Sequence, residues 1–267
     1  MISATEIFSM IGLIRRQSPV VHNITNYVVM NNTANALLAI GASPVMAHAE
    51  EEVAEMVSIA SALVINIGTL SEHWIKSMFL AAGQAAKKGI PIILDPVGAG
   101  ATAYRTKTAR ELIDRHPPTI IRGNASEILS LYDDQTKTKG VDSADSSDKA
   151  IETARAISQK NRCVVCVSGA VDYIAGHDKI LKIRNGHPMM SRVTGLGCTA
   201  SALCGCFAAV EKNDFNATAA AMAVMGIAGE MAADTAAGPG TLQTKFLDCL
   251  YRMSEKDISE RLRIEQS

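Results

Sequence analysis

Residues 193–201 have the composition of a loop that opens a helix and binds an anion. Gly195 and Gly197 allow backbone conformations that a Cβ atom would hinder, and small apolar residues typical of a buried helix follow them. The first N–H groups of a helix lack an intrahelical acceptor, and the helix dipole favours an anion beside them. Cys198 would stand at this end, where a thiolate is favoured. The segment therefore predicts an anion site with a candidate base, which suits phosphoryl transfer.

This segment alone also fits a purely structural interpretation. Gly-x-Gly before a helix is a common pattern, and such a short motif is weak support for a phosphate site. A free cysteine on an apolar helix usually serves packing. The phosphate interpretation therefore depends on the rest of the chain.

Polar side chains follow several apolar runs that have the composition of buried strands. In a parallel sheet the working residues lie just past the carboxyl ends of the strands, so these side chains are expected at one edge. Two carboxylates, an arginine and a hydroxyl beside an anion site are what magnesium-dependent phosphoryl transfer requires. The residues at the expected strand ends are Asn23, Asn26, Met46, Gly68, Asp95, Arg122, Asn124, Glu127 and Ser168.

The elements that would position these residues alternate between strand and helix. We expect an α/β fold with three layers, in which a mostly parallel central sheet is covered by helices on both faces. Expected strands are 20–22, 41–46, 62–67, 90–95, 119–122 and 163–168, with a hairpin at 173–175 and 180–184; expected helices are 5–17, 27–40, 53–60, 71–88, 106–115, 150–159, 200–210, 217–233 and 242–253, with one more after 123–127.

No break in composition divides the chain, so we expect a single domain over residues 1–267. The polar stretch 133–148 is expected to be a surface loop because the alternating pattern resumes after it. The charged end, residues 254–267, is expected to be peripheral, and either amphipathic or frayed.

Composition excludes several classes of function. The formal net charge is -1 and aromatic residues make up 4% of the 267, so neither a basic surface nor stacking platforms for nucleic acid are expected. The N-terminus lacks the pattern of a secretory signal. The longest apolar run, 217–233, is interrupted by Gly226, Gly229 and Glu230, so no membrane span is expected. A cytoplasmic protein without membrane or nucleic-acid partners is the expectation.

The cysteines predict no metal centre. Of the six, Cys163 and Cys166 have the spacing of half a zinc site, but no second pair accompanies them. Residues three apart on a strand face opposite sides of the sheet, so these two thiols would point apart. We expect reduced, buried thiols.

Four longer motifs carry a family resemblance. They are VHNITNYVV at 21–29, LDPVGAGA at 94–101, RGNASEI at 122–128 and VTGLGC at 193–198. In this order they resemble the hydroxyethylthiazole kinase family of thiamine salvage, within the ribokinase-like superfamily, over about residues 15–252. The resemblance implies transfer of phosphate from ATP to 4-methyl-5-(2-hydroxyethyl)thiazole. It also implies a homotrimer with sites between subunits.

The resemblance assigns the metal and the nucleotide. Asp95 and Glu127 would hold Mg²⁺, largely through waters because Mg²⁺ dehydrates reluctantly; the alternative is that each caps a helix. Arg122, Ser168 and Thr194 would bind ATP, and the fork of donors on an arginine suits phosphate. The structural alternatives are a surface ion pair for Arg122 and a turn role for Ser168.

The resemblance also assigns the acceptor substrate. Met46 and Gly195 match the positions that contact the thiazole, where a thioether suits a heteroaromatic ring, although Met46 alone fits a core residue. Asn26 matches a position near the substrate hydroxyl and the phosphates. His22 is expected to be a buried structural imidazole rather than a catalytic one.

The catalytic assignment falls on Gly197 and Cys198. Most ribokinase-like kinases have an aspartate at the position of Cys198, as the base that accepts the hydroxyl proton, whereas thiazole kinases have cysteine. A thiol is usually protonated at neutral pH, but a loose transition state demands little of the base. Backbone N–H groups of the loop would then carry much of the catalysis.

Three other functions are the alternatives. A related kinase could act on a pyrimidine or a sugar alcohol. A dinucleotide-binding oxidoreductase would need Gly-x-Gly-x-x-Gly after the first strand, and no such motif occurs there. A binding protein that has lost turnover would have no need to retain Asp95, Arg122, Glu127 and Cys198 together.

Overall fold

The structure, a computed structural model, describes residues 2–132 and 143–266. Within these residues it contains one nine-stranded sheet, in the order β2-β1-β3-β4-β5-β6-β7-β8-β9. The first six strands along the chain pair in parallel, and the remaining pairs are antiparallel. The strands are β1 (Val20–Ile24), β2 (Ser43–Val45), β3 (Ala62–Asn66), β4 (Ile92–Asp95), β5 (Ile120–Asn124), β6 (Val164–Ser168), β7 (Asp172–Ala175), β8 (Ile180–Ile183) and β9 (Ile264–Gln266).

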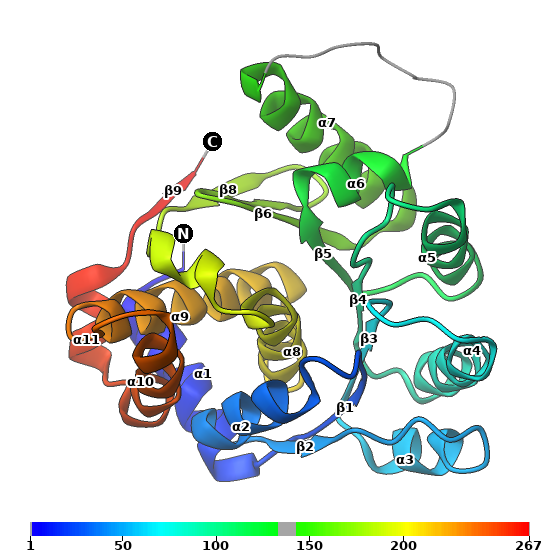
Figure 1. Ribbon diagram of the computed structural model, residues 1–267, viewed down its shortest axis with the longest axis horizontal. Helices are drawn as coiled ribbons and strands as arrows, with labels where there is room; N and C mark the ends of the chain where they lie inside the picture. Colours follow the sequence, from blue (N-terminus) through cyan, green and yellow to red (C-terminus); the bar gives the residue numbers. More distant parts are fainter. Residues whose placement is uncertain (1, 133–142, 267) are drawn as a thin grey trace.

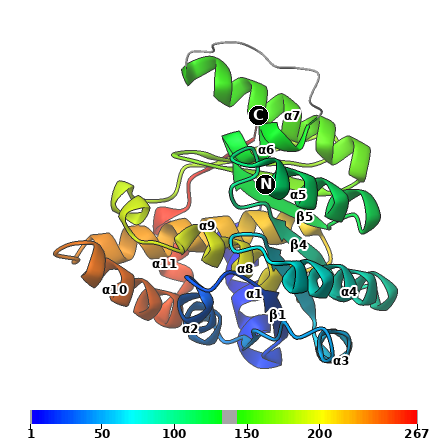
Figure 2. The same cartoon turned by 45° about the vertical axis from the view of Figure 1, so that its right-hand side comes forward.

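Helices cover both faces of the sheet, which confirms the expected three layers (Figure 1). Figure 2 shows α4 and α10 on opposite sides of the sheet. One face carries α3 (Val53–Ile59), α4 (Glu72–Lys88), α5 (Ala103–Arg115), α6 (Ala125–Leu131) and α7 (Ser143–Asn161). The other carries α1 (Ala4–Gln17), α2 (Met30–Ile40), α8 (Leu196–Ala208), α9 (Asp214–Ala233), α10 (Pro239–Arg252) and α11 (Glu255–Arg261), with the 3₁₀ helix η1 (Pro188–Arg192) nearby.

Each face of the sheet has its own hydrophobic core. Along β3, Val64 belongs to the core beneath α8, whereas Leu63 and Ile65 belong to the core beneath α4. Strands buried on both faces need continuous apolar runs, which is why those runs were readable in the sequence. Cys163 and Cys166 lie in different cores, as the strand geometry predicted, and both are free thiols.

Several predicted boundaries were wrong. The helix predicted over 27–40 begins at Met30, because residues 26–29 form a turn closed by a hydrogen bond from Val29 N to Asn26 O. The strand predicted over 90–95 begins at Ile92, after a proline that has no N–H to donate. The helix α8 begins at Leu196 rather than at residue 200, so Cys198 lies in its first turn.

The predicted loop 133–148 is partly wrong, because α7 already begins at Ser143; residues 133–142 lie outside the described residues. The charged C-terminal segment forms α11, with Ile258 fully buried, and β9, which pairs with β8 at one end of the sheet. No helix in the described ranges combines the length and the hydropathy that a membrane span requires.

Candidate active site

Buried polar side chains gather at the carboxyl ends of β1, β3 and β4, where the sequence predicted them. Asn66 and Asp95 are partners in the parallel register of β3 and β4. Asn26 Nδ2 donates to Asn66 Oδ1 at 2.9 Å, and Asn66 Nδ2 donates to Asp95 Oδ2 at 2.7 Å. Asn26 Nδ2 also lies 3.5 Å from Cys198 Sγ. The structure therefore brings Asn26, Asp95 and Cys198 together through Asn66.

Asp95 is a buried carboxylate with one oxygen left over. Its Oδ2 also accepts a hydrogen bond from Ser201 Oγ at 2.8 Å, whereas its Oδ1 is buried and has no hydrogen-bond partner among the described residues. Burial raises the pKa of Asp95 to about 6 against the opposing charge of Arg122, and the charge of Glu127 raises it further. A second carboxylate therefore lies within electrostatic range of Asp95.

Glu127, the second carboxylate predicted to hold the metal, also has a structural role. Its Oε2 accepts from Asn124 N at 2.8 Å, and Asn124 Oδ1 accepts from Glu127 N at 2.9 Å, which makes a capping box at the start of α6. Its Oε1 accepts from Gly98 N at 2.9 Å. The helix-capping interpretation of Glu127 is thus correct, and each of its oxygens retains a free lone pair.

The carboxylates fit a divalent cation that keeps most of its waters. Asp95 offers the unpartnered Oδ1 and Glu127 lies near enough to affect its pKa. Within the described ranges, no cluster of three or more His, Cys, Asp or Glu could enclose a metal. Mg²⁺ is typically bound by one or two carboxylates together with waters and phosphates, so the donor set suits it better than a metal that needs a full protein cage.

Cys198 lies in the first turn of α8, but its surroundings do not favour the thiolate that a helix N-terminus by itself would stabilise. Burial, followed by the negative charge of Asp95, raises the pKa of Cys198 to about 11. Hydrogen bonds from Asn66 and Asn26 and the charge of Arg122 oppose this increase. Desolvation therefore outweighs the helix end, and Cys198 is a protonated thiol near neutral pH, as thiols usually are.

The two loop glycines permit two close approaches. Gly195 caps α8 with a φ of +82°, and a Cβ there would lie 2.7 Å from Val29 Cγ1. A Cβ on Gly197 would lie 3.1 Å from Arg122 Nη1. The loop therefore contacts the start of α2 on one side and the Arg122 guanidinium on the other.

Arg122 and Ser168 form a second polar group at the ends of β5 and β6. Arg122 Nη2 donates to Ser168 Oγ at 2.8 Å, and Ser168 Oγ donates to Gly123 O at 3.3 Å. Burial alone would lower the pKa of Arg122, but nearby acidic groups, chiefly Asp95, raise it overall. The guanidinium therefore stays charged, as an anion site requires.

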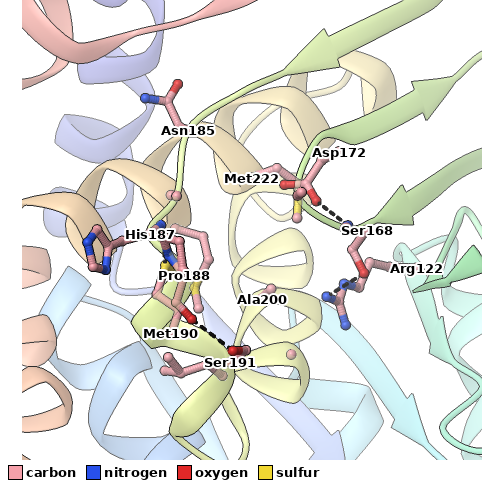
Figure 3. A pocket seen from close by; sticks show the side chains of 17 residues that line it. Arg122, Ser168, Asp172, Asn185, His187, Pro188, Met190, Ser191, Ala200 and Met222 are labelled. Carbon is pink, nitrogen blue, oxygen red and sulfur yellow. Dashed lines mark hydrogen bonds between the residues drawn. The ribbon is translucent and has the colours of Figure 1, made fainter. Parts of the chain in front are cut away.

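This second group lies at the wall of a pocket of about 540 Å³ (Figure 3). Arg122, Ser168 and Gly197 supply polar groups, whereas Met222 and Met225 of α9 supply an apolar surface. Residues 185–191 form the opposite wall, on which Figure 3 shows His187, Pro188 and Met190. A polar edge beside an apolar recess suits a ligand with a charged group and a ring system.

The remaining predicted residues are less tightly joined. Met46 is half-buried directly after β2, and Thr194 is exposed in the loop before Gly195. No hydrogen bond among the described residues links Met46, Thr194 or Glu127 to the Asn26–Asp95–Cys198 group. His22 is fully buried, as predicted, with Nε2 2.8 Å from Ala47 O; burial lowers its pKa, so it is neutral.

Sequence reasoning missed several residues. Asn66 joins the polar group, yet it stands inside an apolar run whose end was placed at Gly68. An asparagine aligned with Asp95 on the next strand was the available signal. Ser201, one turn after Gly197, was treated only as part of an apolar helix. The wall formed by residues 185–191 had no recognisable pattern.

Known proteins resemble this chain over nearly its whole length. The model of the hydroxyethylthiazole kinase family matches residues 11–256. A hydroxyethylthiazole kinase of Syntrophus aciditrophicus (strain SB) is 64% identical over 252 residues, covering 94% of this chain and 93% of that protein. One of Leptospira biflexa (strain Patoc 1 / Ames) is 60% identical over 250 residues, covering 94% of each.

Solved structures give the same result for the fold. The hydroxyethylthiazole kinase structure from Pyrococcus horikoshii OT3 has a TM-score of 0.90 at 42% identity, covering 98% of this chain and 99% of that chain. A ribokinase-like superfamily protein of Enterococcus faecalis V583 has a TM-score of 0.64 at 17% identity, covering 90% and 87%. At that identity the likeness concerns the fold alone, which is the expected ribokinase-like α/β fold.

Proposed function

The chain belongs to the hydroxyethylthiazole kinase family, and we propose that it transfers a phosphoryl group from ATP to the hydroxyl of 4-methyl-5-(2-hydroxyethyl)thiazole, giving the thiazole phosphate and ADP for thiamine biosynthesis. One observation supports this most: the glycine loop contacts Arg122 on one side and the start of α2, which follows Asn26, on the other. An anion site and a group able to orient a hydroxyl then lie on the two sides of one helix N-terminus.

ATP occupies the pocket beside Arg122 in this proposal. Arg122 and Ser168 bind its phosphates, with Thr194 and the N–H groups of Gly197 and Cys198 as further donors. The Met222 side of the pocket receives the base, because an apolar recess with soft thioethers suits a flat ring. The positive charge of Arg122 and the helix end both favour the charge that builds up on the transferred group.

Asp95 and Glu127 hold Mg²⁺ in this proposal, with Asp95 Oδ1 as the ligand atom on the β4 side. The bound ion would neutralise phosphate charge. The protein's own part is to orient the carboxylates: Asn66 and Ser201 fix Asp95 through Oδ2, and Asn124 and Gly98 fix Glu127. Oriented carboxylates lose little freedom when a cation binds.

The acceptor alcohol binds on the other side of the loop. Met46 and Gly195 contact the thiazole ring, and Asn26 orients the hydroxyl. Cys198 Sγ, 3.5 Å from Asn26 Nδ2, lies where it could accept the hydroxyl proton. Its raised pKa keeps the thiol protonated in nearly all molecules near neutral pH, so little of the base form is present, and positioning and charge stabilisation supply most of the rate in this proposal.

The site is shared between subunits of a homotrimer in the cytoplasm, on this proposal. Tyr27 and Val28 directly follow Asn26, and each is 66% exposed. Met46 follows β2, which lies at one end of the described sheet. Exposed apolar side chains beside a half-open site are what a neighbouring subunit would cover.

The decisive experiment measures ADP formed from ATP by the purified protein. We expect turnover with hydroxyethylthiazole and Mg²⁺, and none in excess chelator. Pyrimidine and sugar alcohols at equal concentration should give at most a few per cent of that rate. A faster reaction with one of these alcohols would replace the proposed substrate, and no turnover with any alcohol would favour a binding protein.

A further inference from the structure

The three residues that interrupt the apolar run of α9 face one wall of the nucleotide pocket. A Cβ on Gly226 would lie 2.6 Å from the backbone of Asn185, and a Cβ on Gly229 would overlap Met190 Sδ. The two glycines therefore let Asn185 and Met190, at the two ends of the segment 185–190, lie directly against α9. This segment forms most of the wall across the pocket from Arg122.

Glu230 binds the same wall with its carboxylate. It is 9% exposed, and its Oε1 accepts from Gly186 N at 2.7 Å and from Asn185 Nδ2 at 3.2 Å. Gly186 has a φ of +138°, which residues with side chains rarely adopt. The carboxylate thus holds the backbone at the point where it turns into the pocket wall.

The C-terminal segment completes this arrangement. Arg263 Nη2 donates to Glu230 Oε1, and Arg263 N donates to Asn185 Oδ1 at 2.9 Å. Asn185 Nδ2 also donates to Arg261 O at 2.7 Å. Arg261 and Arg263, which lie just before β9, therefore bind the pocket wall through Asn185 and Glu230.

We propose that Glu230 is a positioning residue for nucleotide binding. It acts together with Arg263, its ion-pair partner, and with Gly226 and Gly229, which make room for the pocket wall. It fixes residues 185–190 at the distance from Arg122 that the nucleotide needs. The inference rests on the proposed function, in which ATP and ADP bind the pocket beside Arg122. Glu230 touches neither the substrate nor the reacting atoms, so its effect falls on nucleotide affinity and spares the thiazole side.

The test measures the dissociation constant of ADP by calorimetry, without thiazole, together with the KM values for ATP and hydroxyethylthiazole. Glu230→Ala should raise the dissociation constant of ADP on the order of 10-fold, because a factor of this size corresponds to the loss of one hydrogen bond to a charged group. Glu230→Gln keeps an acceptor for Gly186 N and should recover most of the affinity. Gly229→Ala should weaken ADP binding about 5-fold, because a factor of this size corresponds to about 1 kcal/mol of displaced packing.

Two controls match these changes in chemistry. Gly240→Ala adds a methyl group where nothing beyond its chain neighbours and its own helix backbone lies within 4 Å, and Glu260→Gln alters a glutamate on α11 whose side chain is 62% exposed. Both should bind ADP as the wild type does. In every variant the KM for hydroxyethylthiazole should stay within about 2-fold, less than half a kcal/mol.

The outcomes separate this inference from the proposed function. If Arg122→Ala binds ADP as tightly as the wild type, the nucleotide is elsewhere and both are overturned. If Arg122→Ala no longer binds ADP, while folded Glu230→Ala and Gly229→Ala bind it with wild-type affinity, only the positioning role is overturned. If Glu230→Ala does not fold, the ADP affinities of Glu230→Gln and Gly229→Ala test the positioning role instead. Equal increases in both KM values would also overturn the role, since they would indicate general loosening.

Discussion

Replacing Cys198 with alanine or aspartate tests how much the reaction depends on a base. Cys198 lies in the first turn of α8 beside Asn26, and burial and Asp95 raise its pKa to about 11. At pH 7 such a thiol is ionised in about one molecule in 10⁴. A thiolate mechanism would therefore use a very small fraction of the enzyme in this state.

The size of the expected loss follows from what a general base usually contributes and from how little a loose transition state demands of it. A positioned general base contributes roughly 10²–10⁴-fold, and a loose transition state places the value toward the lower limit. We expect Cys198→Ala to lower kcat on the order of 10²-fold with little change in the KM for ATP. Cys198→Asp should retain far more activity than Cys198→Ala, because a carboxylate needs no prior loss of a proton near neutral pH and suits the helix end.

The assay is steady-state ADP formation from pH 6 to 9, with ADP binding and thermal unfolding as controls for a folded site. The wild-type kcat should rise with pH, since deprotonation of a thiol with a raised pKa creates the base. The Asp variant should be nearly flat over the same range. If Asp is as inactive as Ala while both variants fold and bind ADP, the assignment of Cys198 as base is wrong, and the loop acts through its backbone N–H groups alone.

Three further predictions concern the carboxylates and the assembly. Chelation should abolish turnover, and Glu127→Gln should raise the Mg²⁺ concentration needed for half-maximal rate; full activity in excess chelator would exclude the metal. The fold raises the pKa of Asp95 from 3.8 to about 6, so the protonated carboxyl adds about 3 kcal/mol to the free energy of unfolding below pH 4. This contribution is lost as the pH rises through 6. Metal-free Asp95→Asn should therefore gain stability over the wild type as the pH rises from 4 to 7, and equal pH dependence of their unfolding free energies would contradict this. Light scattering should give about three times the 28.3 kDa chain mass, and a fully active monomer would rule out a shared site.

The sequence was sufficient for the fold and for much of the site because both rest on local patterns. Strands buried on both faces need unbroken apolar runs, and these gave the parallel sheet. Carboxyl ends of parallel strands meet at one edge, so Asn26, Asp95 and Ser168 could be placed there from the sequence alone. The loop at Gly195 and Gly197 could be predicted from the sequence because a close approach of backbone to a neighbouring group requires glycine.

Other features depend on contacts between distant segments, which local patterns do not record. Asn66 looked like part of an apolar strand, although it joins Asn26 to Asp95. The ionisation of Cys198 depends on how completely the site excludes water, and the helix end alone suggested the opposite state. Gly226 and Gly229 interrupted an apolar run, but only the packing shows that they make room for residues 185–190.

The position of α8 would let two separate polar groups act on the one proposed reaction. Its N-terminal glycines approach Val29 on the proposed acceptor side and Arg122 on the proposed nucleotide side, so this helix end fixes the spacing between the two groups. Along the same helix, Ser201 holds Asp95, and Thr199 accepts from Asn32 Nδ2 at 2.9 Å. A shift of α8 would change all of these contacts together. A phosphoryl transfer needs its attacking and leaving oxygens roughly in line. The proposed chemistry therefore requires that α8 stay fixed, and its buried packing against β3 and β4 keeps it so.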